Sequence, residues 1–261
     1  MEWKQTTSLI TGASSGIGQE FARELAKRGS RVVLVARRED RLHALAQELV
    51  ELGAVAPVVI PMDLACEDAA TALKRQTDEL GLQIDALINN AGFSEHGSIH
   101  EISPQAQGRL LQLNVSTMAG LVSTYLPGMR SKGRGAIVNL ASIASFHPLP
   151  TQAAYAASKA FVLSYTESLW EESRGSGVRV LALCPGATAT GFFERLGQDV
   201  KAPKHTPKAV VETALRALDK DRMTVVDGWW NAFLSRFLPR ITCRKLAARV
   251  SGAVIRRMYR A

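Results

Sequence analysis

The stretch that decides the fold is Thr11–Gly18, which reads T-G-A-S-S-G-I-G and lies between an apolar run and a helical pattern. Gly12 can adopt backbone angles that a side chain forbids, and Gly16 and Gly18 allow the backbone and the helix to approach each other closely. The free amides of such a helix would then face a pyrophosphate. Any tight strand-to-helix turn favours glycine, so the spacing G-x-x-x-G-x-G leaves a purely structural turn open.

Apolar runs alternate with helical patterns along most of the chain. Strands separated by helices of this kind predict βαβ units and an α/β fold, a doubly wound parallel sheet flanked by helices. Ligands of such sheets bind beyond the carboxyl ends of the strands. The predicted strands are Ser8–Ile10, Arg31–Ala36, Val55–Met62, Ala86–Asn89, Ala136–Leu140, Val178–Cys184 and Met223–Val226, and helices are predicted at Gln19–Arg28, Arg41–Leu52, Glu67–Leu80 and Arg109–Tyr125.

Length and composition favour a single catalytic domain over residues 1–228 with a helical extension over residues 229–261. A chain of 261 residues that is 46% hydrophobic can bury one large core. Its three cysteines, Cys66, Cys184 and Cys243, are far apart and lack metal-ligand spacing, which predicts reduced, buried thiols and no metal site. Without a visible signal peptide or a long apolar stretch, a cytoplasmic location is expected.

The positive charge of the chain is concentrated at its carboxyl end. The formal net charge is +8, and residues 229–261 hold eight basic and no acidic side chains. The global charge therefore does not indicate a nucleic-acid partner. Leu246, Val250, Val254 and Met258 recur every four residues, as on one side of a helix. This segment is predicted either to dock on the domain or to form a basic amphipathic element that contacts a membrane or an acidic carrier protein.

Several strand ends carry residues suited to a dinucleotide. At the end of the second strand an NAD site usually places an acidic side chain, but here Arg37 and Arg38 follow Ala36. Two guanidinium groups without a carboxylate favour a 2′-phosphate and hence NADP(H). Basic residues after a strand are also often merely solvated. Asp63 and Leu64 follow the third strand, and Asn90, Ala91 and Gly92 follow the fourth.

A second group of residues suggests proton transfer. Tyr155 and Lys159 are four residues apart, so on a helix they share one face. A tyrosine held beside a cationic lysine can exchange a proton with a carbonyl or alcohol oxygen. Ser142 follows another strand and could hold the substrate oxygen. Asn114 lies inside a helical stretch, where asparagine is unfavourable, which indicates a local role such as a kink or a held water.

Taken together and in this order, these motifs resemble those of the short-chain dehydrogenase/reductase family. The resemblance covers roughly Gln5 to Asp227 and rests on residues 11–18, N-N-A-G at 89–92, Asn114, Ser142, Y-A-A-S-K at 155–159 and P-G-A-T-A-T at 185–190. It implies a Rossmann-like fold and a tetrad of Asn114, Ser142, Tyr155 and Lys159. Tyr155 would be the acid/base, Lys159 would bind the nicotinamide ribose and lower the pKa of the tyrosine, Ser142 would orient the carbonyl, and Asn114 would hold a relay water.

The resemblance also implies an NADP-preferring cofactor site and a pairing of subunits into a homodimer or homotetramer. The implied cofactor contacts are Gly12, Ser14, Ser15, Gly16, Ile17, Gly18, Arg37, Arg38, Asp63, Leu64, Asn90, Ala91, Gly92, Tyr155, Lys159, Pro185, Gly186, Thr188 and Thr190.

The expected activity is NADPH-dependent reduction of a small, apolar carbonyl compound. The segment 191–207 holds Phe192, Phe193 and Leu196, which suits an apolar substrate under a mobile lid. A 3-oxoacyl compound and a steroid-like ketone both remain open as substrates. The alternative from another class is a regulatory protein that binds NADP without catalysis, but a regulator has no need of an intact tetrad.

Overall fold

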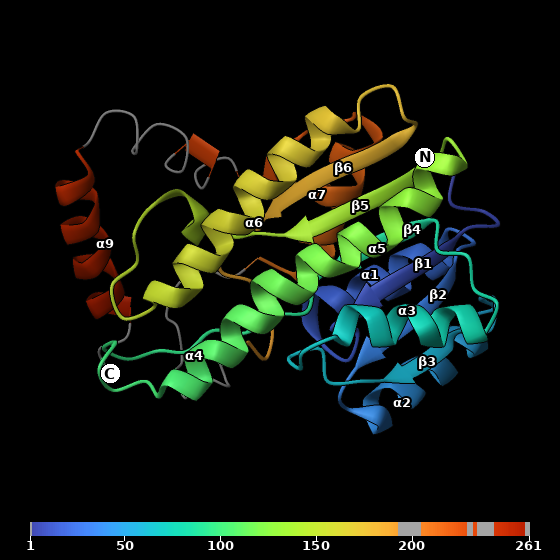
Figure 1. The fold of residues 1–261 in the computed structure, drawn as a ribbon, viewed down its shortest axis with the longest axis horizontal. Coiled ribbons are helices and arrows are strands. Elements are labelled where there is room, and N and C mark those ends of the chain that lie inside the picture. Colours follow the sequence, from blue (N-terminus) through green and yellow to red (C-terminus); the bar gives the residue numbers. More distant parts are fainter. Residues whose placement is uncertain (1, 193–204, 229–231, 234–242, 259–261) are drawn as a thin grey trace.

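The computed structural model describes residues 2–192, 205–228, 232–233 and 243–258. Its centre is a parallel sheet of seven strands in the order β3-β2-β1-β4-β5-β6-β7. Figure 1 shows these strands with helices along them. The strands are β1 (Thr7–Thr11), β2 (Arg31–Ala36), β3 (Val58–Pro61), β4 (Ala86–Asn89), β5 (Gly135–Leu140), β6 (Val178–Cys184) and β7 (Thr224–Val226).

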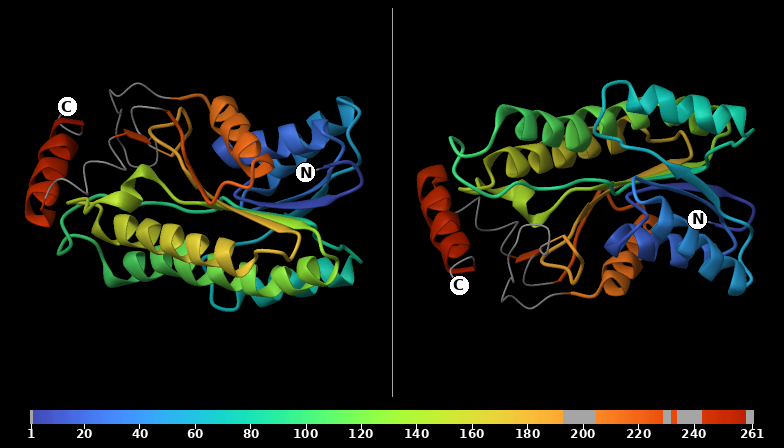
Figure 2. Two further views of the ribbon diagram at one scale, coloured as in Figure 1. Left: turned by 90° about the horizontal axis from the view of Figure 1, so that it is seen from above. Right: turned by 90° about the horizontal axis from the view of Figure 1, so that it is seen from below.

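Helices cover both faces of the sheet, which confirms the predicted doubly wound α/β fold. One apolar core joins α1, α2 and α7 to one face, and a second core joins α3, α5 and α6 to the other. Figure 2 shows the two helical layers from the side. The helices are α1 (Gly16–Lys27), α2 (Glu39–Glu51), α3 (Ala69–Glu79), α4 (Pro104–Leu111), α5 (Met118–Ser131), α6 (Ala153–Glu172), α7 (Pro207–Asp219) and α9 (Arg244–Met258).

The continuous apolar runs of the sequence follow from this double covering. In β2, Val32 and Leu34 point into the first core, while Val33 and Val35 point into the second. Because side chains alternate between the two faces of a strand, a strand buried on both faces must be apolar at every position.

The strand order reverses between β1 and β4. From β1 the chain builds outward through β2 and β3, and from β4 it builds in the other direction to β7. Such a reversal leaves a crevice beyond the carboxyl ends of the two strands, because their crossover helices lie on opposite faces. The glycine-rich turn and the segment after β4 therefore meet at one place.

Three of the sequence predictions need correction. The helix predicted over Arg109–Tyr125 consists of the end of α4, a π-helical turn η1 (Gln112–Thr117), and α5. The strand predicted from Val55 begins only at Val58, because the chain first closes the end of α2 with a bond from the Ala54 amide to the Leu49 carbonyl. Cys66 and Cys243 are exposed, so only Cys184 matches the predicted buried thiols.

Helix α9 lies at the end of the molecule towards which β5 and β6 point (Figures 1 and 2). Its Ala247 and Ile255 are buried, with exposed fractions of 8% and 7%. The helix is therefore packed on the rest of the protein, as the docked alternative predicted. Leu234, Phe237, Leu238 and Ile241 of the predicted extension, and Phe193 and Leu196 of the predicted lid, lie outside the described residues. Within the described part of the chain, no helix has the length and hydropathy to cross a membrane.

Candidate active site

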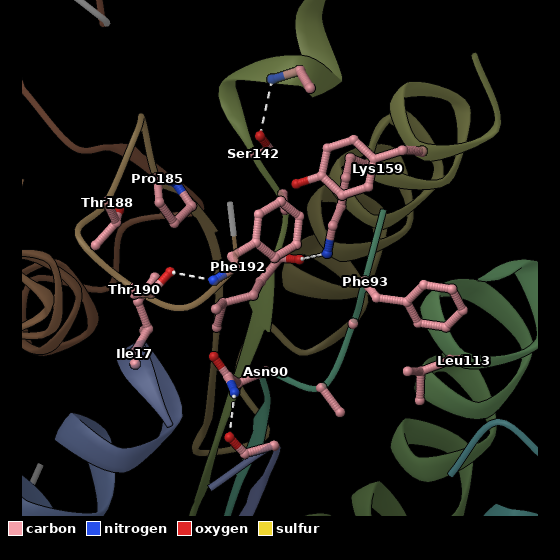
Figure 3. Close-up of a pocket in the computed structure, with 18 of the residues that line it drawn as sticks. Ile17, Asn90, Phe93, Leu113, Ser142, Lys159, Pro185, Thr188, Thr190 and Phe192 are labelled. Carbon is pink, nitrogen blue, oxygen red and sulfur yellow. Dashed lines mark hydrogen bonds between the residues drawn. The ribbon is translucent and has the colours of Figure 1, made fainter. Parts of the chain in front are cut away.

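A cavity of about 490 Å³ opens at the carboxyl ends of the central strands (Figure 3). It brings together nearly all the residues that the sequence predicted for the site. Of these, Gly12, Ser14, Ser15, Gly16, Ile17, Arg37, Arg38, Asp63, Leu64, Asn90, Ala91, Gly92, Ser142, Tyr155, Lys159, Pro185, Gly186, Thr188 and Thr190 line the cavity directly. Gly18 and Asn114 lie behind its wall.

The glycine-rich turn has the shape that the sequence predicted. Gly12 and Gly16 have φ values of 68° and 60°, in the left-handed region that disfavours side chains. A Cβ atom on Gly16 would also lie 2.7 Å from the Thr190 Cγ2 atom. Ser15 precedes α1 without a side-chain cap, so the first amides of the helix remain available to a ligand.

Asn90 ties the segment after β4 to this turn. Its side-chain amide donates to the carbonyl oxygens of Thr11 at 2.8 Å and Gly12 at 3.2 Å, a link that Figure 3 shows in part. The Thr11 hydroxyl accepts bonds from the amides of Asn90 and Ala91. Asn90 thus fixes the segment after β4 to the glycine-rich turn after β1, at the point where the strand order reverses.

The Arg38 side chain bends back over the turn. Its guanidinium donates to the Ser14 hydroxyl at 2.9 Å and the Ser15 hydroxyl at 2.8 Å. Arg37 is exposed and also lines the cavity, and the buried residue before it is Ala36. Two cations and two hydroxyls therefore gather at the end of β2, where an acidic side chain would otherwise accept a ribose hydroxyl.

Asp63 follows β3 and lines the cavity. Although burial opposes its ionisation, bonds from the Ala65 amide and from Arg109 keep the pKa of Asp63 below its ordinary value. The Arg109 guanidinium lies 2.8 Å from the Asp63 carboxylate. This partner comes from α4, 46 residues away, and nothing in the sequence indicated it.

Helix α6 positions Tyr155 and Lys159 on one face. The Lys159 ammonium is buried, donates to the Leu140 carbonyl at 2.7 Å and lies 5.8 Å from the centre of the Tyr155 ring. Burial lowers the pKa of Lys159 to about 8, because the charged form loses its hydration. Ser142 caps the short helix η2 (Ile143–Phe146) by accepting a bond from the Ala144 amide at 3.1 Å.

Asn114 sits in the π-helical turn and is 2% exposed. Its side chain accepts from the Phe93 amide and donates to the Phe93 carbonyl and to the Ser158 hydroxyl. A Cβ atom on Gly92 would lie 3.0 Å from the Asn114 oxygen and 3.5 Å from the Lys159 nitrogen. The Asn114 side chain and the Lys159 ammonium therefore both lie next to Gly92. The helix position that the sequence marked as unfavourable for asparagine therefore lies in an irregular turn. Such π-helical bulges are frequent at functional sites.

The loop after β6 forms another part of the cavity wall. The Thr190 hydroxyl accepts from the Phe192 amide at 3.3 Å, and the Phe192 ring lies 5.8 Å from the Tyr155 ring (Figure 3). A short parallel bridge joins Thr188 to His205. His205 also pairs with the buried Asp227 at 2.9 Å, and neither residue was predicted from the sequence to support this loop.

Sequence reasoning missed part of the apolar wall. Phe93, Leu113, Ile143 and Leu149 could have been found from their position next to the predicted motifs, although their side-chain directions depend on loop geometry. His147 also lines the cavity, and burial holds the pKa of its imidazole below the ordinary value. A further part of the wall comes from α9 residues Val250, Ser251, Val254 and Ile255, about ninety positions or more beyond Lys159.

Comparisons with known proteins agree with this geometry. The family model for short chain dehydrogenases matches residues 6–201. Over 223 residues the chain is 31% identical to the very-long-chain 3-oxoacyl-CoA reductase of Bos taurus. This alignment covers 83% of this chain and 69% of the relative.

Solved structures give the same picture. A short-chain dehydrogenase from Sphingobium yanoikuyae in complex with NADPH superposes with a TM-score of 0.81 at 34% identity, covering 87% of this chain and 91% of that one. A 7β-hydroxysteroid dehydrogenase superposes with a TM-score of 0.87 at 26% identity, covering 96% and 98% of the two chains.

Proposed function

The chain belongs to the short-chain dehydrogenase family of oxidoreductases, and on that premise we propose that it uses NADPH to reduce an apolar carbonyl compound to an alcohol. One observation carries the proposal: Ser142, Tyr155 and Lys159 line the same cavity as the glycine-rich turn. A 3-oxoacyl compound and a steroid-like ketone are both candidate substrates, since the chain is similar to a protein named as a 3-oxoacyl-CoA reductase and to one named as a hydroxysteroid dehydrogenase.

The residues present fit a dinucleotide with a 2′-phosphate. The left-handed glycines and the uncapped start of α1 would hold the pyrophosphate, and Arg37 and Arg38 with the Ser14 and Ser15 hydroxyls would hold the 2′-phosphate. The remaining contacts proposed for the dinucleotide are Ile17, Gly18, Asp63, Leu64, Asn90, Ala91, Gly92, Tyr155, Lys159, Pro185, Gly186, Thr188 and Thr190.

When bound, NADPH would supply the hydride for the proposed reaction. The Tyr155 hydroxyl gives its proton to the substrate oxygen, and the Ser142 hydroxyl holds that oxygen. The Lys159 ammonium stabilises the negative charge left on the tyrosine oxygen, because an adjacent cation in a dry site is weakly screened. Asn114, which adjoins the lysine, would position water on the path that returns the proton.

Turnover measurements test the proposed function. Purified protein with NADPH is expected to oxidise the cofactor in the presence of some members of a panel that includes 3-oxo esters, aryl ketones and a 3-ketosteroid. NADPH binding without turnover of any panel member, in both directions of reaction, would favour the regulatory alternative.

The cofactor preference should depend on Arg38. We expect kcat/KM for NADPH to exceed that for NADH at least tenfold, which corresponds to about 1.4 kcal/mol and lies within the reach of one charge-assisted bond. Arg38→Leu should reduce this ratio about tenfold or more, mainly through KM for NADPH. Arg41→Leu, an exposed arginine of α2 outside the cavity, is the control and should leave the ratio unchanged. Equal wild-type values for the two cofactors would contradict the proposal.

We also propose that two subunits pair through the helices that carry Asn114 and Tyr155. Phe161 of α6 is 40% exposed and stacks on Tyr165 at 5.5 Å, which leaves an aromatic surface on this face. Light scattering should show the molar mass of a homodimer or homotetramer, and Phe161→Glu should lower that mass towards the monomer. Val50→Glu, at another exposed apolar residue, on α2, should leave the assembly unchanged. A wild-type monomer at micromolar concentration would exclude this pairing.

A further proposal concerns the extension beyond residue 228. Arg244, Lys245 and Arg249 of α9 are exposed, and the described part of the chain gives them no ion pair. These charges support a peripheral contact with an anionic membrane or with an acidic carrier protein. Salt screens such attraction, so sedimentation with anionic vesicles at low and at high salt tests it.

A further inference from the structure

Helix α9 contributes a distinct wall to the cavity. Val250, Ser251, Val254 and Ile255 line it, so two i,i+4 pairs of one helix face inward. Ala247, one turn before Ser251 on the same side, is buried. The helix therefore packs at the cavity along Ala247, Ser251 and Ile255, and its two valines lie beside that line.

The wall that α9 supplies is apolar. The one polar side chain among these four is Ser251, and its hydroxyl already donates to the Ala247 carbonyl at 2.8 Å. Arg249 is exposed and does not line the cavity. At about 100° per residue, Lys245 and Arg249 fall on the opposite side of the helix from Ser251. Among the described side chains of α9, a ligand in the cavity therefore meets hydrocarbon and one paired hydroxyl, and no charge.

The valines are incompletely covered. Val250 and Val254 are 43% and 49% exposed although they face the cavity, whereas Ile255 is 7% exposed. Leu246, one turn before Val250 on the same side, is 47% exposed and continues the stripe outside the cavity. From Leu246 to Val254 the stripe runs for about 12 Å along the helix axis. Among the described residues, this narrow apolar track continues from the cavity lining to Leu246 outside it, and about half of each of its side chains is exposed.

We propose that α9 is the outer wall of the substrate site and that the substrate is a carbonyl compound with an extended alkyl chain, which lies along Val250 and Val254 and leaves past Leu246. This inference rests on the proposed function and names its substrate class. A long chain covers the whole stripe, whereas a compact ketone reaches only its inner end. Binding energy should then rise with each methylene group until the track is filled.

A chain-length series tests the proposal. With methyl 3-oxoalkanoates of 4 to 12 carbons and saturating NADPH, kcat/KM of the wild type should rise by about twofold to fourfold per added methylene over part of the series. Val254→Asp places a charge on the track. Its loss of kcat/KM should be small with the shortest substrate and exceed tenfold with the longest, mainly through KM.

Matched variants keep the result interpretable. Ala253→Asp puts the same charge on an exposed position of α9 outside the cavity and should retain the wild-type slope. Val254→Ala removes apolar surface without adding charge and should reduce the slope even if Val254→Asp folds poorly. NADPH affinity, measured by fluorescence, should be the same in all three variants because the cofactor half of the cavity is untouched.

The possible failures are distinct. If no member of the series consumes NADPH and no other carbonyl does, the proposed function itself fails. If carbonyls are reduced but the rate is independent of chain length, or if Val254→Asp and Ala253→Asp lower it equally at every length, α9 is not a substrate wall. Loss of vesicle binding in Val254→Asp with an unchanged slope would assign the stripe to a membrane surface and overturn the proposal.

Discussion

Replacing Tyr155 by phenylalanine should lower kcat by about a thousandfold or more while the dissociation constant for NADPH stays within twofold. The hydroxyl acts only when a proton moves in the transition state, and general acid catalysis of this kind contributes about 10²–10⁴-fold. The aromatic ring remains in the variant and can still pack against Phe192, whose ring centre lies 5.8 Å from that of Tyr155. Single-turnover kinetics with NADPH and a reactive ketone would separate the chemical step from binding.

Tyr165→Phe is the matched control for this substitution. Tyr165 lies on the same helix, is half buried and does not line the cavity. Its loss of a hydroxyl should leave kcat within about twofold. A Tyr155→Phe enzyme that keeps a tenth of wild-type activity would mean that another group supplies the proton.

Gly18→Ala should abolish measurable NADPH binding. A Cβ atom here would lie 2.5 Å from the Gly12 carbonyl oxygen and would also collide with the Asn90 side chain. Both neighbours hold the turn that faces the proposed pyrophosphate, and Asn90 already donates to that carbonyl. The turn must therefore move, and overpacking of this kind costs about 1–3 kcal/mol of stability as well. Cofactor titration by fluorescence and a thermal melt measure the two effects.

Gly108→Ala provides the opposite case. Gly108 lies inside α4, and a Cβ atom there meets no atom within 4 Å. Because alanine favours a helix over glycine by about 1 kcal/mol, this variant should be slightly more stable and bind NADPH normally. If Gly18→Ala bound NADPH as well as Gly108→Ala, close packing at Gly18 would not be needed for the site.

The sheet was predictable because its strands are buried on both faces. The runs Arg31–Ala36, Ala86–Asn89 and Val178–Cys184 have the predicted ends. The meeting of Gly12 with Asn90 was predictable in outline, because parallel strands end at the same edge of the sheet.

Other features depend on tertiary contacts that no local pattern encodes. The π-helical turn at Asn114 inserts into what reads as one helix, and only the unfavourable asparagine indicated it. Arg109 reaches Asp63 from a distant helix. For α9, spacing predicted an apolar side, but it did not indicate that Val250 and Val254 line the cavity.

The buried ammonium of Lys159 couples protonation to both folding and ligand binding. Because burial lowers its pKa from the ordinary value of 10.5 to about 8, the unfolded chain binds a proton that the folded chain lacks between these two pH values. The free energy of unfolding of the unliganded protein should therefore rise with pH across this interval. A ligand that favours the charged lysine must take up a proton there, so its affinity falls as pH rises through 8. Calorimetric titration of NADPH in buffers of different ionisation enthalpy would record that proton, and equal heats in all buffers would show that cofactor binding and the lysine titrate independently.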